Sequence, residues 1–209
     1  MALRRRTERK RADMLAAGRR AFLERGYRDA SMDAIAREAN VSKRTLYSHF
    51  ESKESLFEAI VRDAGDEMVA PIRRADADAD VEATLTALGK EFVRLALSPW
   101  VNALHRLVVA ESVRFPELGR LYYETASEKL WNVVADYLAE QARRGTLRIE
   151  NPRLAAEQFC AILSGHPHVR LQLGVDRRRS RRAMEDDVKY GVELFLHGCR
   201  PSTERRRSP

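Results

Sequence analysis

The chain has 209 residues, 44% of them hydrophobic, with 10 glycines and 7 prolines and a formal net charge of +7. This composition suits one large domain or two small ones and excludes collagen-like and largely disordered chains. No apolar run approaches the roughly 20 residues that span a bilayer, and no apolar segment follows the basic N-terminus as it would in a secretory signal, so we expect a cytoplasmic protein.

The positive charge is concentrated at the N-terminus. Residues 1–50 hold 13 Lys or Arg against 6 Asp or Glu, whereas residues 51–209 hold 25 of each sign. A basic end joined to a neutral body indicates contact with nucleic acid, because basic side chains bind phosphate. The alternative is a segment on a membrane surface, but no strongly apolar face accompanies these basic residues.

Helical spacing of apolar residues predicts an all-α fold, since no alternating β pattern of useful length occurs. Residues 1–11 form a basic arm that we expect to be mobile until it meets a polyanion. A first helix follows from about residue 8 to residue 25, and Gly26 ends it.

Residues 31–50 predict two short helices joined by a tight turn. Ser31 and Ser42 are suitable N-caps, Asn40 tolerates the left-handed turn, and Leu46 and Phe50 point inward from the second helix. An ordinary pair of packed helices would share these features. It does not explain why residues 43–50 include no acidic side chain and present mainly cations and hydroxyls outward. Phosphates and guanine edges favour such hydrogen-bond donors, and a carboxylate would be repelled. The pattern therefore favours a DNA-binding helix-turn-helix.

Further apolar stripes predict a helical body. After a fourth helix capped by Ser52, we expect a connector at residues 71–80 and a helix break at residues 164–168. The remaining helices are expected at about 81–97, 99–115, 117–144, 151–163 and, after a basic stretch at 177–182, up to Cys199. The last helix has a wide apolar face, more than one chain's core easily covers.

Residues 16–56 resemble the TetR family of bacterial transcriptional regulators. The spacing that carries the resemblance runs through Phe22, Gly26-Tyr27, Ser31, Ile35-Ala36, Val41-Ser42, Leu46-Tyr47, His49-Phe50 and Lys53-Glu54. Asn40 stands where many members have glycine, and Arg44 stands where a small residue is common. Residues 115–124 and 137–159 are similar to the AefR-like branch of the family's C-terminal domains.

The resemblance implies roles for single residues. Base or groove-floor contacts are expected from Lys43, Arg44 and Tyr47, and phosphate contacts from Ser31, Thr45, His49 and Lys53. A solvated helix face is the alternative for His49 and Lys53, and core packing is the alternative for Tyr47.

The resemblance also implies functions for the helical domain that follows the helix-turn-helix. We expect a DNA-binding domain with its fourth helix at residues 12–70, an effector-binding and dimerisation domain at 71–199, and a disordered tail at 200–209. The candidate pocket residues are Trp100, His105, Tyr122, Tyr123, Trp131, Phe159 and His166, and the expected dimer interface is Phe159, Leu163, Val188, Val192, Phe195 and Leu196. Each pocket residue has simple packing as its alternative.

The expected function is that of a ligand-responsive repressor. It would bind a palindromic operator on double-stranded DNA as a homodimer, with no cofactor, and a small apolar or amphipathic molecule would release it. One alternative is an architectural DNA-binding protein without an effector. A weaker one is a metal-responsive regulator using His166 and His168, although neither Cys160 nor Cys199 forms a metal motif with them. No catalytic motif recommends an enzyme.

Overall fold

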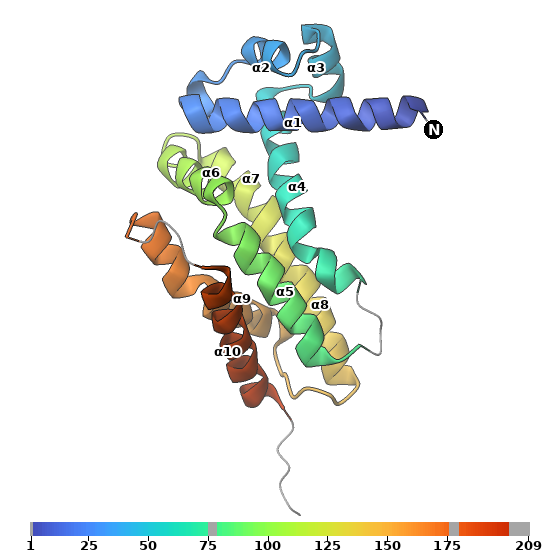
Figure 1. Cartoon of the computed structure of the whole chain (residues 1–209), viewed down its shortest axis with the longest axis vertical. Helices are drawn as coiled ribbons and strands as arrows, with labels where there is room; N and C mark the ends of the chain where they lie inside the picture. Colours follow the sequence, from blue (N-terminus) through green and yellow to red (C-terminus); the bar gives the residue numbers. More distant parts are fainter. Residues whose placement is uncertain (1, 75–78, 176–179, 201–209) are drawn as a thin grey trace, which may run out of the picture. The chain divides into compact units, whose positions relative to one another are not determined.

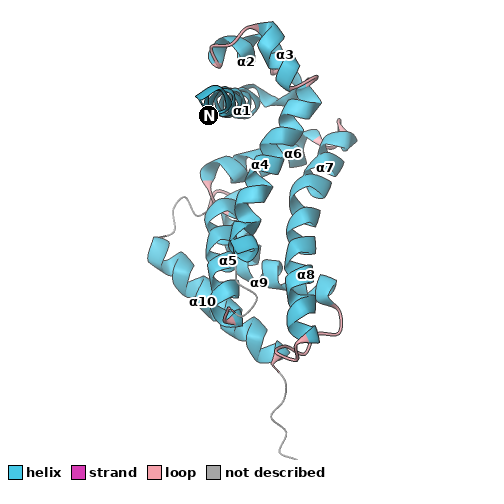
Figure 2. Cartoon of the chain, turned by 90° about the vertical axis from the view of Figure 1, so that its right-hand side faces the viewer, coloured by secondary structure: helices cyan, strands magenta, loops and turns pink. Residues whose placement is uncertain are grey.

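The computed structural model describes residues 2–74, 79–175 and 180–200, and within these ranges every regular element is helical (Figures 1 and 2). The prediction of an all-α fold is confirmed. The helices are α1 Ala2–Asp29, α2 Met32–Glu38, α3 Lys43–His49, α4 Lys53–Arg74, α5 Val81–Ala96, α6 Pro99–Glu111, α7 Pro116–Tyr122, the π-helical segment η1 Tyr123–Glu128, α8 Lys129–Arg143, α9 Pro152–Gln172 and α10 Arg181–Cys199.

Helix caps fix several of these starts as the sequence predicts. The Asn151 side chain accepts a hydrogen bond from the Leu154 amide at 3.0 Å, and Pro152 occupies the first position of α9. Ser180 accepts in the same way from Ala183 at 3.2 Å. Such caps satisfy backbone donors that have no partner inside the helix.

Three local expectations were wrong. Residues 2–11 form the beginning of α1 instead of a separate arm, and the helical backbone is interrupted at Gly26, where φ is +80°. The expected connector at 71–80 is helical as far as Arg74, and residues 75–78 lie outside the described part. The expected break at 164–168 is absent, because α9 continues through Pro167 at the loss of one backbone hydrogen bond. The expected tail lies outside the described residues beyond Arg200.

The chain forms two compact units that are discontinuous in sequence. The first contains the described residues up to Asp66 together with Pro99–Ser127, and the second contains Glu67–Ser98 together with the described residues from Glu128 onward. The boundaries fall within α4, between α5 and α6, and at the end of η1. The expected assignment of functional domains stays a prediction, because compact packing does not assign roles.

The first unit has a core shared by α1, α2, α3, the start of α4, α6 and α7. Phe22, Leu46 and Phe57 are fully buried in it, and Leu104 and Leu118 join the same cluster from α6 and α7. The helix-turn-helix is therefore supported by residues about 60 positions later in the chain as well as by α1.

The second unit packs α5, α8, α9 and α10 together. Gly89 of α5 and Gly191 of α10 permit close helix crossings, since a Cβ atom at Gly89 would lie 2.9 Å from Val188 and one at Gly191 would lie 2.7 Å from Leu163. The residues of the expected dimer interface take part in this packing, and the interface itself stays a prediction. All six residues are buried within this chain: Phe159, Leu163, Val188, Val192, Phe195 and Leu196.

Over the part of the chain that the structure describes, no helix has the length and apolar character to cross a membrane.

Candidate nucleic-acid interface

The turn between α2 and α3 has the geometry of a helix-turn-helix. Asn40 adopts a φ of +52°, and the Val41 amide donates to the Ala36 carbonyl at 3.0 Å. Ile35 and Leu46 are fully buried on the facing sides of the two helices. Figures 1 and 2 show both helices against one side of α1. The turn residue is left-handed, as predicted, because asparagine tolerates that conformation.

Hydroxyl groups organise the start of α3. The Ser42 side chain accepts a hydrogen bond from the Thr45 amide at 3.1 Å and lies 2.8 Å from the Thr45 hydroxyl. Ser31 has the extended backbone of an N-cap for α2, but its side chain forms no capping hydrogen bond. The exposed Ser31 hydroxyl at a helix N-terminus is therefore available to an anion.

The outward side of α3 presents Lys43, Arg44 and Tyr47. Tyr47 is 40% exposed, which disfavours the core-packing alternative. Arg44 is exposed, and within the described residues its guanidinium has no hydrogen bond or ion pair. Lys43 pairs with Asp33 of α2 at 2.8 Å, and this hydrogen bond raises the pKa of the lysine. Both members of that pair are exposed, so phosphate or a base edge can compete for the lysine.

Lys53 and His49 have environments that the sequence did not reveal. The Lys53 ammonium donates to the Arg28 carbonyl at 2.9 Å and to the Ala30 carbonyl at 3.4 Å, and it lies 4.8 Å from the Tyr27 ring centre. Lys53 thus binds the C-terminal end of α1, where the helix dipole favours a cation. His49 is half-buried beside Phe50.

An aromatic cluster supports the interface from behind. Tyr27 packs against Phe22, Phe57 and Phe115 with ring centres 5.5–5.9 Å apart. Its hydroxyl donates to Glu54 at 3.0 Å, and burial, followed by the charge of Glu54, raises the pKa of Tyr27. The sequence pattern predicts no role for Tyr27 or for Asp33. Their partners lie 27 and 10 positions away along the chain, beyond the reach of helical spacing.

The expected effector-pocket residues are divided between the two units. In the first unit, the His105 and Tyr122 rings are 5.8 Å apart, burial raises the pKa of Tyr122 to about 12, and Trp100 lies under Arg19. Tyr123, also of the first unit, is 47% exposed. A pocket lined by all seven residues stays a prediction.

The three pocket residues of the second unit differ in burial. Phe159 is fully buried against Phe195, Trp131 is half-buried under Arg153, and His166 is exposed. Among the described side chains, no group of three or more His, Cys, Asp or Glu is arranged to hold a metal ion.

Comparison with known families agrees with this geometry. Residues 14–60 match the model for bacterial regulatory proteins of the tetR family, and residues 83–198 match the model for the C-terminal domain of AefR-like transcriptional repressors. The chain belongs to the TetR family. It is accordingly a DNA-binding transcriptional regulator, and the resemblance seen in the sequence is confirmed.

Individual TetR-family proteins are similar over different lengths. A regulator from Mesorhizobium loti is 29% identical, with a TM-score of 0.80 over 94% of this chain and 99% of that one. The flavonoid-responsive regulator FrrA is 31% identical, with a TM-score of 0.75 over 94% of this chain and 100% of its own. The transcriptional activator FasR of Mycolicibacterium smegmatis is 42% identical over 66 residues, which are 32% of this chain and only 30% of FasR.

Proposed function

We propose that this TetR-family regulator is a ligand-responsive repressor that binds a palindromic operator as a homodimer. The observation that carries the proposal is the outward side of α3, where Arg44 and Tyr47 are exposed while Leu46 anchors the helix in the core. A helix held in this way enters the major groove with its first residues against the base edges. Because DNA is the partner, we expect the protein to act in the cytoplasm.

We assign direct base contact to Lys43, Arg44 and Tyr47. Arginine and lysine donate to guanine O6 and N7, and a good bidentate pair contributes about 1–3 kcal/mol of discrimination. The absence of a competing partner for Arg44 within the described residues supports giving it the leading role.

We assign phosphate contact to Ser31, Thr45 and His49. The exposed, uncapped hydroxyl of Ser31 at the start of α2 supports its role. The Thr45 hydroxyl is held by Ser42 at 2.8 Å, which orients it near the start of α3. For Lys53, the bonds to the end of α1 favour an anchoring role over the phosphate contact expected from the sequence.

We place the dimer interface on the exposed apolar side chains of α9 and α10. Leu154, Ile162 and Val169 are each at least 41% exposed on α9, and Tyr190 and Leu194 are 69% and 52% exposed on α10. The α9 residues recur at intervals of eight and seven and therefore share one face. Two copies joined through this surface would present two reading heads to half-sites about 34–36 Å apart, or a multiple of that distance.

Glutamate substitution tests this interface. Tyr190→Glu with Leu194→Glu should convert a dimer to a monomer in sedimentation equilibrium, because burying the new charges without partners is unfavourable. Val113→Glu is the matched control, since Val113 is 90% exposed in the other unit. A dimer that survives the double substitution would contradict this placement.

We propose that a small apolar or amphipathic molecule favours a protein state with lower operator affinity. The similar protein FrrA is flavonoid-responsive, which supports testing flavonoids first, and the match to AefR-like transcriptional repressors supports repression over activation. An effector acts only through different affinities for the two states, typically about 5–150-fold. Flavonoid aglycones should therefore raise the Kd for the operator while leaving weak binding to random DNA unchanged.

The decisive experiment compares DNA sequences by fluorescence anisotropy. The full-length protein should bind a palindrome from its own upstream region at least about 1,000-fold more tightly than a shuffled duplex of equal composition. Arg44→Ala should reduce this ratio, whereas Arg62→Ala on the exposed side of α4 should not. Equal affinity for the two duplexes would refute the proposal and favour the architectural alternative.

A further inference from the structure

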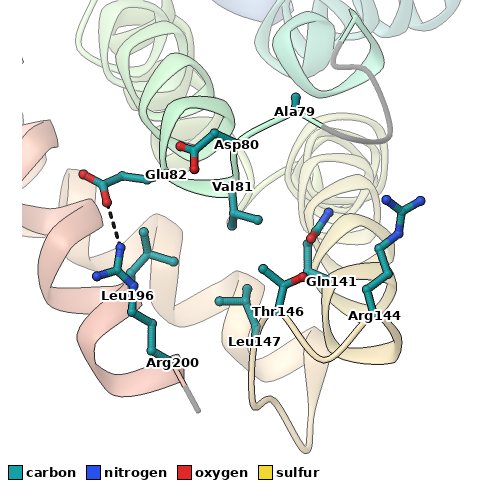
Figure 3. Close-up of a pocket in the computed structure, with 10 residues that line it drawn as sticks. All are labelled: Ala79, Asp80, Val81, Glu82, Gln141, Arg144, Thr146, Leu147, Leu196 and Arg200. Carbon is teal, nitrogen blue, oxygen red and sulfur yellow. Dashed lines mark hydrogen bonds and ion pairs between the residues drawn. The ribbon is translucent and has the colours of Figure 1, made fainter. Parts of the chain in front are cut away.

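A cavity of about 400 Å³ opens at one end of the second unit, where α5 begins and α8 and α10 end (Figure 3). Val81, Leu147 and Leu196 provide its apolar wall, and Gln141, Arg144 and Arg200 provide polar groups. We call it the α5–α8 cavity. Its volume lies within the range of about 300–1,000 Å³ that is usual for small-molecule sites.

Gln141 is the most unusual side chain of the cavity. It is only 4% exposed, and its backbone carbonyl accepts hydrogen bonds from the amides of Thr146 at 3.0 Å and Leu147 at 3.3 Å. Its side-chain amide, in contrast, has no hydrogen-bond partner among the described residues, and it lines the cavity (Figure 3). Because this amide faces the open cavity, a ligand from outside the chain can hydrogen-bond to it without displacing an internal partner.

A second unsatisfied group lies one turn earlier on α8. The Tyr137 hydroxyl is buried and forms no hydrogen bond of ordinary geometry within the described ranges, although the Thr84 side chain is close enough to influence its pKa. Burial raises the pKa of Tyr137, so the hydroxyl remains protonated and able to donate. Positions 137 and 141 are neighbours on one helix face. The end of α8 therefore presents the Gln141 amide to the cavity, with the Tyr137 hydroxyl buried one turn away.

The opposite side of the cavity is the N-terminus of α5. Asp80 caps this helix by accepting the Ala83 amide at 2.8 Å. The amides of Val81 and Glu82 belong to the first turn, whose donors have no partner within a helix. They lie at the positive end of the helix dipole, which favours an anion.

Two arginines flank the cavity, and each is held by an acid. Arg200 donates to Glu82 at 2.8 Å, and Arg144 donates to Glu140 at 2.6 Å, as Figure 3 shows for the first pair. These pairs neutralise the two glutamates and keep both guanidinium groups at the opening. The cavity wall also carries the Asp80 carboxylate, which is engaged as the cap of α5, and the Gln141 amide, which has no such partner.

We propose that the α5–α8 cavity binds a small organic carboxylate with an apolar body. The carboxylate accepts hydrogen bonds from the Gln141 amide and the first-turn amides of α5, with Arg144 and Arg200 at the opening. The apolar body contacts Val81, Leu147 and Leu196. Such binding would hold whether or not the ligand controls DNA release, so it does not depend on the proposed repressor function.

Three aromatic probes of similar size test the charge requirement on the full-length protein by isothermal titration calorimetry. Benzoate should bind saturably, benzamide should bind about tenfold or more weakly, and benzylamine should bind most weakly, because hydrogen bonds to a charged acceptor are stronger than neutral ones. Benzamide or benzylamine binding as tightly as benzoate would overturn the proposed ligand class. The absence of saturable binding by benzoate would overturn the site.

Gln141→Leu removes the amide while preserving most of its volume. Because Gln141 makes no internal side-chain hydrogen bond, the unfolding temperature without ligand should remain equal or rise, while benzoate affinity should fall about tenfold or more. Gln158→Leu, at an exposed position of α9, is the matched control and should change neither quantity.

Arg200→Gln provides a second variant whose folding is not in question, since the side chain is 61% exposed. It should weaken benzoate binding and leave benzamide binding nearly unchanged. Equal benzoate affinity in the wild type, Gln141→Leu and Arg200→Gln would show that any binding occurs elsewhere and would refute the proposal.

Discussion

Replacing Lys53 by methionine distinguishes an anchoring role at the end of α1 from a phosphate contact with DNA. Methionine retains the apolar stem but loses the ammonium bonds to the Arg28 and Ala30 carbonyls and the contact with the Tyr27 ring. A half-exposed site weakens these interactions, so we assign their sum about 1–2 kcal/mol. In a protein of this size, that loss lowers Tm by about 2–8 °C.

The assay pairs thermal unfolding, followed by circular dichroism, with operator binding across a range of salt concentrations. If Lys53 anchors the end of α1, its replacement by methionine lowers Tm and leaves the salt dependence of operator binding unchanged. A lysine that neutralises one phosphate per half-site would instead reduce the slope of log K against log salt by about 2 per dimer. Lys90→Met, at an exposed position of α5, should alter neither result. An unchanged Tm together with the reduced slope would refute the anchoring role.

The remaining predictions concern buried and strained positions. Leu46→Ala should lower the free energy of unfolding in urea by about 2–5 kcal/mol, because its side chain is fully buried. Gly26→Ala should cost about 1–3 kcal/mol in the same assay, because φ is +80° and ψ is 167° there, a region almost restricted to glycine. Burial raises the pKa of Cys160 to about 12, so only the partly exposed Cys199 should react with a thiol reagent at pH 8 until denaturant is added. Burial lowers the pKa of His168 in the folded state, so its contribution to stability is present above the ordinary pKa and is lost as the pH falls below it. His168→Gln should therefore flatten the acid limb of the stability profile, and an unchanged limb would contradict this assignment.

Local sequence signals predicted the helix-turn-helix because its features arise within a few residues. Asn40 tolerates a positive φ, Ser42 caps the following helix, and Leu46 continues the inward stripe. Each is a short-range consequence of backbone geometry. The α3 surface followed from the same periodicity, with Tyr47 exposed and Leu46 buried.

The contacts that the sequence did not predict join distant positions. The bonds of Lys53 to the end of α1 require the tertiary fold. The apolar stripe through Val188 and Val192 was correctly recognised as buried, but periodicity does not tell whether the covering surface belongs to the same chain or to a second copy. Pro167 lies within α9 because neighbouring turns and packing outweigh one lost hydrogen bond.

The discontinuity of the first unit limits how this regulator can be recombined with others. A fragment ending at Asp66 would retain α2 and α3 but lack Leu104, Val108 and Leu118, which belong to the same apolar cluster. The surfaces that these side chains cover would then meet water. A chimera that transfers the DNA-reading segment to another sensor should therefore carry Pro99–Ser127 with it, which means exchanging two separate stretches of the gene.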